Sequence, residues 1–67
     1  MIVITRPRGA DANQRYMVTQ ALRHTLRIAR TDHPATAHAI ATEWSMRQYT
    51  CTPGVMRNIK TLEIQHA

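Results

Sequence analysis

Four side chains in the last quarter of the chain are of the types that read DNA bases: Arg57, Asn58, Lys60 and Thr61. Arginine and asparagine make bidentate contacts with guanine and adenine in the major groove, and lysine and threonine bind phosphates as well as bases. They follow Thr52, whose hydroxyl can cap a helix, and Pro53, which suits a first helical position. We therefore expect a helix that begins at Pro53 and brings these four side chains, together with Thr52, to a DNA groove.

Other arginines could hold the phosphate backbone. Three of them recur at the i, i+4, i+7 spacing of one helix face: Arg23, Arg27 and Arg30. This arginine stripe either lies along a phosphate backbone or forms a solvated face. Arg6 and Arg8 lie on an N-terminal arm that could hold the backbone or enter a minor groove. Arg47 lies in the polar segment that we expect to form the turn before Pro53.

Charge and residue types favour a polyanionic partner over catalysis. The 67 residues include nine Lys and Arg against four Asp and Glu, which gives a formal net charge of +5 and a pI of about 10.8. A basic surface binds polyanions because each neutralised phosphate releases counterions. The acidic residues are scattered, the only glycines are Gly9 and Gly54, and no nucleophile motif surrounds Ser45 or Cys51. We therefore expect no enzyme, no cofactor and no small-molecule ligand.

The cysteine and histidine content indicates the cellular setting. Cys51 is the only cysteine, which excludes an intramolecular disulfide and favours a reducing, cytoplasmic compartment. The four histidines show neither ligand spacing nor thiolate partners, so we expect no metal site. The apolar run from Met1 to Ile4 is too short for a signal peptide or a membrane span, so we expect no membrane association.

The sequence pattern predicts one short β-strand and three helices. β-Branched residues favour a strand over residues 1–5. Apolar periodicity and capping signals favour three helices: one that Asp11 or Asn13 caps and that runs to about Arg30, one over residues 34–44, and one from Pro53 onward. The residues after Leu62 either prolong the third helix or form a strand. The apolar residues that share helical faces form the expected core: Val18, Leu22, Leu26, Ile40, Trp44, Val55, Ile59 and Leu62.

A chain of this length buries a small core, and neither a disulfide nor a metal supplements it. The N-terminal strand also needs a partner. It could pair with a strand after the last helix or with the same strand of a second subunit. We therefore expect a single domain over residues 1–67 that forms a homodimer.

Two segments between Ala35 and Glu63 resemble the DNA-binding helices of winged-helix transcription factors. Ala-Ile-Ala-Thr-Glu-Trp, residues 39–44, resembles the alanine-containing positioning helix. Thr-Pro-Gly-Val-Met-Arg-Asn-Ile-Lys-Thr-Leu-Glu, residues 52–63, resembles a recognition helix of the form Thr-x-x-Val-x-Arg-x-Ile-x-x-Leu-Glu. The resemblance implies that Arg57, Asn58 and Thr61 face DNA. It also implies these core residues: Ile40, Ala41, Trp44, Val55, Ile59 and Leu62.

The sequence thus predicts a mainly α, three-helix, winged-helix-like helix-turn-helix domain with a short N-terminal β-strand. The predicted function is sequence-specific binding of double-stranded DNA by a transcriptional regulator of bacterial or phage origin. The alternative is a small basic protein-interaction module, an adaptor or inhibitor, that uses the same helical fold to bind an acidic surface.

Overall fold

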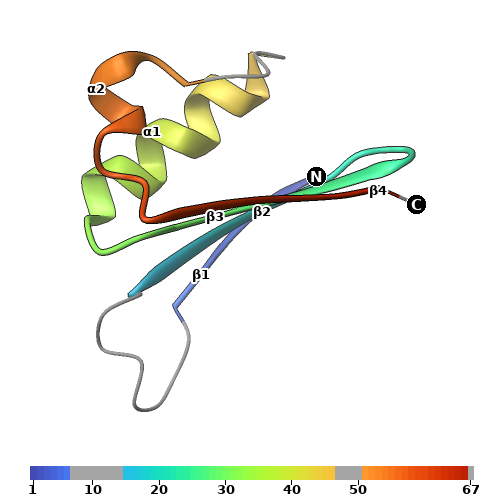
Figure 1. Cartoon of the computed structure of the whole chain (residues 1–67), viewed down its shortest axis with the longest axis horizontal. Helices are drawn as coiled ribbons and strands as arrows, with labels where there is room; N and C mark the ends of the chain where they lie inside the picture. The colour runs from blue at the N-terminus through green and yellow to red at the C-terminus, as the bar shows by residue number, and fades with distance from the viewer. Residues whose placement is uncertain (7–14, 47–50, 67) are drawn as a thin grey trace.

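In the computed structural model, a four-stranded antiparallel sheet carries two helices on one of its faces (Figure 1). The structure describes residues 1–6, 15–46 and 51–66. Within these residues no helix has the length and apolar character that crossing a membrane requires. The strands lie in the order β1-β2-β3-β4. The elements are, in chain order, β1 (Ile2–Thr5), β2 (Tyr16–Ala21), β3 (Thr25–Thr31), α1 (Pro34–Ser45), α2 (Pro53–Met56) and β4 (Thr61–His66).

The register of the strands divides their side chains between two faces, because directly paired residues point to the same side of a sheet. The helices cover one face. Its two central rows across the four strands are Ile4–Val18–Ala29–Leu62 and Ile2–Gln20–Arg27–Ile64. We call the other side the open face. Its rows are Thr5–Met17–Arg30–Thr61 and Val3–Thr19–Ile28–Glu63.

The prediction of a first helix that runs to about Arg30 is wrong. The residues described there form β2 and β3, joined by a tight turn in which the amide of Leu22 donates to the carbonyl of Thr25 at 2.7 Å. A strand with one buried face shows alternating apolar residues. Here two of the alternating buried positions are polar, Gln20 and Arg27. The alternation was therefore hidden, and the remaining apolar residues matched a helical spacing instead.

The predicted third helix is wrong beyond its first turn. α2 holds four residues, and the chain then returns to the sheet as β4. Of the two alternatives for the residues after Leu62, the strand is correct. Because the described chain is a four-stranded sheet with one longer helix, the mainly α, three-helix, winged-helix-like helix-turn-helix fold is also wrong.

Two predicted elements are present. The N-terminal strand exists as β1, but it pairs with β2 rather than with a C-terminal strand. The helix α1 begins as expected with Pro34 at a first helical position. Its N-cap residue is His33, which makes no side-chain cap hydrogen bond. The hydroxyl of Thr31 instead accepts a hydrogen bond from the His33 amide at 3.2 Å, which shapes the connection from β3 into the helix.

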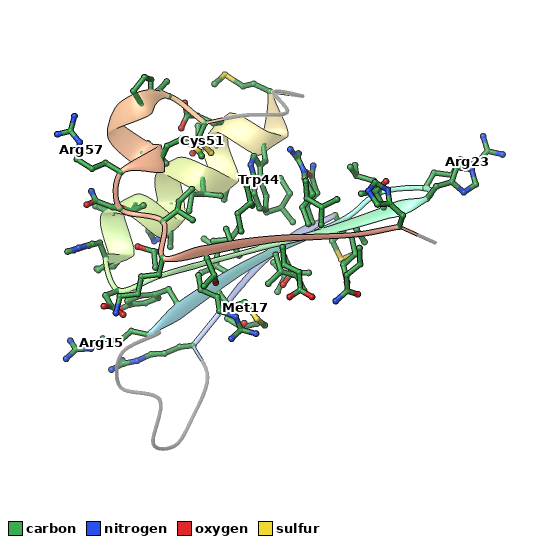
Figure 2. All side chains as sticks on the ribbon, viewed as in Figure 1. Arg15, Met17, Arg23, Trp44, Cys51 and Arg57 are labelled. Atoms are coloured by element: carbon green, nitrogen blue, oxygen red, sulfur yellow. The ribbon has the colours of Figure 1, made fainter. Side chains whose placement is uncertain are left out.

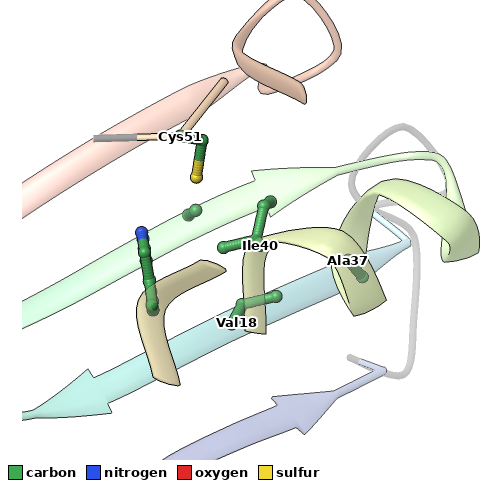
Figure 3. Packing of buried hydrophobic residues seen from close by; sticks show 6 residues of the cluster. Val18, Ala37, Ile40 and Cys51 are labelled. Atoms are coloured by element: carbon green, nitrogen blue, oxygen red, sulfur yellow. The ribbon is translucent and has the colours of Figure 1, made fainter. Parts of the chain in front are cut away.

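The core lies between α1 and the three strands that it covers, β1, β2 and β3. Figure 3 shows Val18 of β2, Ala37 and Ile40 of α1, and Cys51 converging in this layer. The fully buried alanines let the helix approach the sheet closely. Of the predicted core, Val18, Ile40 and Trp44 are buried, whereas Val55 and Ile59 lie at the margin. Leu26 is partly exposed, and Leu22 and Leu62 are exposed.

A buried arginine connects the sheet to the helix. Arg27 is only 5% exposed, and it lies directly opposite Gln20 in the register of β2 and β3. Its Nε donates to the Gln20 Oε1 at 2.9 Å, and its Nη2 donates to the same oxygen. Its guanidinium carbon lies 4.5 Å from the centroid of the Trp44 ring, which is the geometry of a cation–π contact. One side chain thus bonds to a neighbouring strand and stacks on α1.

The burial pattern predicts that Ile40→Ala destabilises the protein much more than Leu22→Ala. Ile40 is 0% exposed and Leu22 is 42% exposed, although the sequence pattern placed both in the core. Truncation of a buried isoleucine costs about 2–5 kcal/mol, and an exposed site costs about 0.5 kcal/mol. Urea denaturation of the two variants measures the difference. Equal losses of unfolding free energy would show that the helix-to-sheet packing is misassigned.

Candidate nucleic-acid interface

Basic residues gather at one end of the sheet. β1 and β3 finish at this end, and β2 and β4 start from it. We call this end, with the loop into β4, the basic end, and its cations are Arg6, Arg15, Arg30, Arg57 and Lys60. Figure 2 shows Arg15 and Arg57 on the same side of the molecule, opposite Arg23.

Each strand contributes one cation to this end. Arg6 follows β1, Arg15 precedes β2, Arg30 is the last residue but one of β3, and Lys60 precedes β4. Arg30 lies in the row Thr5–Met17–Arg30–Thr61, and the other three cations lie one or two residues along the chain from this row. Neighbouring strands are about 4.8 Å apart, so the row spans about 14 Å.

One carboxylate lies within the basic end and helps to order it. The Asp32 Oδ2 forms an ion pair with the Lys60 Nζ at 2.7 Å. The backbone amide of Arg15 donates to the Asp32 Oδ1 at 3.4 Å. The Lys60 hydrogen bond, supported by the Arg15 amide, holds the pKa of Asp32 below its ordinary value. Asp32 therefore remains ionised and connects the beginnings of β2 and β4.

The connection from α2 to β4 carries the fifth cation. The Thr31 hydroxyl donates to the carbonyl of Asn58 at 2.8 Å, which fixes this connection against the end of β3. Arg57 adjoins Asn58 at the end of α2 and is exposed. The amide of Lys60 donates to the Arg30 carbonyl at 2.8 Å and leads the chain into β4. The strand end and the loop thus form one ordered surface.

The structure brings together many of the residues that the sequence assigned to DNA. Arg6, Arg30, Arg57, Asn58, Lys60 and Thr61 lie at or beside the basic end. Thr52 is the exposed N-cap residue of α2, without a side-chain cap hydrogen bond. Arg23 lies in the turn at the opposite end of the sheet and does not join the cluster. Arg8 and Arg47 lie outside the described residues.

The assignment of Arg27 to the phosphate backbone needs correction. Its guanidinium is buried between Gln20 and Trp44, so it cannot reach a ligand on the surface. The arginine stripe does not exist as a helix face, because Arg23, Arg27 and Arg30 lie in a turn and a strand. Alternation along β3 buries Arg27 on the helix-covered side and leaves Arg30 on the open face.

Neither of the two helices in the described residues has the features of a base-reading helix. α1 contains no lysine or arginine between Pro34 and Ser45, and its buried side packs on the sheet. α2 is a single turn, shorter than a helix that reads a groove. The placement of Arg57, Asn58, Lys60 and Thr61 on a recognition helix is therefore wrong. These residues occupy the loop and the strand start that follow α2.

Two other core residues that carry ionisable groups are Glu43 and Cys51. The amide of Thr52 donates to the Glu43 Oε1 at 2.9 Å, which connects α1 to the start of α2. Burial raises the pKa of the Cys51 thiol, and the carboxylate of Glu43 raises it further, so the thiol stays protonated. No three His, Cys, Asp or Glu side chains lie together as a metal site in the parts of the chain that the structure describes.

Comparison with known protein families, curated proteins and solved structures found no significant match to this chain. Its function must therefore be argued from its own residues.

Sequence reasoning missed one member of the basic end, Arg15. Arg15 falls within the predicted first helix, and the sequence pattern assigns it no role. The available signal was the position of Arg15 immediately before β2, in which Tyr16, Val18 and Thr19 are of strand-favouring types, comparable to Lys60 before β4. Cations at the ends of successive strands become neighbours only when the strands pair. Their grouping can therefore be predicted only when the strand topology is known.

The Asp32 contacts predict a low carboxyl pKa that depends on Lys60. In an NMR titration, the Asp32 carboxyl should ionise below the ordinary aspartate pKa of about 3.9, and Lys60→Gln should move it upward. Because the folded-state pKa is lowered, the stability from this pair is present above that ordinary value and is lost as the pH falls through the folded-state pKa.

Arg23→Gln is the matched control, since it removes one charge at the other end of the sheet. It should leave the titration of Asp32 nearly unchanged. Equal shifts in the two variants would mean that net charge, and not the ion pair, sets this pKa.

Proposed function

We propose that the basic end of the protein binds the phosphate backbone of duplex nucleic acid. The observation that carries this proposal is that one cation from each strand lies at the same end of the sheet, with Arg57 on that side of the molecule. Asp32 is the single carboxylate among the described residues of this end. The charge of the described chain is thus concentrated where a polyanion can meet it.

The dimensions of the row suit a phosphate backbone. Four cations across about 14 Å give a charge density comparable to that of a nucleic-acid strand, which carries one charge per about 3.4 Å of axis. Arg30 lies on the open face beside Thr61, whose hydroxyl adds a neutral donor for a phosphate oxygen. Contacts of this kind fix the position of a protein on a duplex without reading its sequence.

The aromatic residues favour a duplex over a single strand. Proteins that bind single strands stack bases on exposed aromatic side chains. In the described chain, Trp44 is buried under Arg27 and Tyr16 packs against the core, so neither offers a stacking surface. The duplex backbone needs no such surface. Regulation of transcription stays a prediction that depends on this binding.

Salt dependence tests the proposed contact. If four or five phosphates are neutralised, log K for a random duplex falls with log salt at a slope of about −4. Arg30→Gln should reduce the steepness of the slope by about one, because it removes a single phosphate contact. Fluorescence anisotropy of a labelled duplex, titrated at several salt concentrations, measures both slopes.

Arg23→Gln is the control, with the same change in net charge at the opposite end of the sheet. Its slope should equal that of the parent protein. Arg57→Gln tests the same contact at an exposed site outside the sheet and should behave like Arg30→Gln. Equal effects of Arg23→Gln and Arg57→Gln would refute a localised contact. Absence of binding at low salt would refute the proposed function.

A further inference from the structure

The last strand, β4, lies exposed at one edge of the sheet. All six residues of β4 are exposed, including the apolar Leu62 at 44% and Ile64 at 49%. Among the described elements, β4 packs only against β3, whereas α1 covers β1, β2 and β3. An uncovered edge strand with apolar side chains is a template for pairing with another strand.

The hydrogen-bond pattern identifies the backbone groups that face this edge. In an antiparallel ladder, alternate residues direct both their N–H and their C=O toward the same neighbour. The bond from the Leu22 amide to the Thr25 carbonyl sets this alternation, so Arg27 and Ala29 face β2 while Ile28 and Arg30 face β4. The bond from the Lys60 amide to the Arg30 carbonyl agrees with this assignment.

The same alternation extends to β4. Its residues opposite Ile28 and Arg30 are Glu63 and Thr61, and these face β3. The backbone groups of Leu62, Ile64 and His66 therefore point away from the sheet. The side chains of these three residues also lie on the helix-covered side, where β4 extends beyond α1.

A second copy of this chain matches this edge when the pairing is centred on Ile64. Two β4 strands then run antiparallel, with Ile64 opposite Ile64 and Leu62 opposite His66. On the open face, Glu63 lies opposite Gln65 of the other copy. Within one chain the Gln65 Nε2 already donates to the Glu63 Oε1 at 2.9 Å, so these groups are suitable partners. Every outward backbone group of the three residues finds a partner.

The neighbouring symmetric register is unfavourable. If the pairing is centred on Glu63, two carboxylates lie directly opposite each other, and like charges in that position destabilise a sheet. The other edge, β1, is less suited to pairing, because α1 packs over it and holds Ile2 and Ile4 in the core margin. Two copies joined at β1 would bring two helices together at the junction.

We propose that two copies of the chain pair through β4, with Ile64 on the two-fold axis, and form one continuous eight-stranded antiparallel sheet. The helices of both copies lie on the same side. The two basic ends point in opposite directions along the strands. This inference rests on the β4 edge alone and holds whether or not the basic end binds nucleic acid.

Analytical ultracentrifugation of the full chain tests the pairing. The parent protein should sediment as a dimer at tens of micromolar. Ile64→Lys and Ile64→Glu should each weaken the dimer at least tenfold, because each places two like charges across the axis. An equimolar mixture of the two variants should dimerise again, since Lys and Glu then face each other.

Val3→Lys is the matched control, at a similarly exposed apolar residue of β1, and it should sediment like the parent. Circular dichroism verifies that each variant keeps its sheet. A parent protein that stays monomeric at these concentrations would overturn the proposal. A mixture of Ile64→Lys and Ile64→Glu that fails to dimerise would overturn the register, as would a loss of dimer in Val3→Lys.

Discussion

The contact of Arg27 with Gln20 and Trp44 is the interaction on which the arrangement depends. It places a charged group in the centre of a small core, where an unpaired charge would cost several kcal/mol. The bonds to Gln20 join β2 to β3, and the stacking on Trp44 joins β3 to the last turn of α1. Because Arg27 belongs to β3 and Trp44 to α1, this polar contact also helps to fix the position of the helix on the sheet.

The same contact explains why some elements of the fold could be predicted from the sequence and others could not. β1 and the start of α1 were predictable, since β-branched residues and Pro34 act locally. β2 and β3 were not, because Gln20 and Arg27 occupy buried alternating positions and satisfy one another only after the strands pair. The third predicted helix failed for a related reason: Val55, Ile59 and Leu62 fit a helical face, yet in the structure Leu62 lies on an exposed strand. The sequence singles out Arg6, Arg30, Arg57 and Lys60 by residue type, but their position at one end of the sheet depends on the topology.

The strand pairing of the sheet determines where the basic side chains lie. One arginine enters the core, one remains in the hairpin turn, and the residues that flank the strands gather at the opposite end. A helix-turn-helix would have displayed its cations along one helix, whereas this sheet displays them across its width. The ion pair between Asp32 and Lys60 then ties two strand ends that are far apart in the sequence. The sheet thus supplies the order that a recognition helix would supply in another architecture.

We propose that one end of the sheet, and not a helix, contacts the phosphates. Amide chemical-shift mapping of the labelled protein against an unlabelled random duplex tests it most directly. The account predicts that the largest shifts occur at Arg6, Arg15, Arg30 and Lys60, with little change at Arg23 and along α1. Shifts centred on α1 or on the hairpin turn at Arg23 would contradict it, as would an unchanged spectrum at low salt.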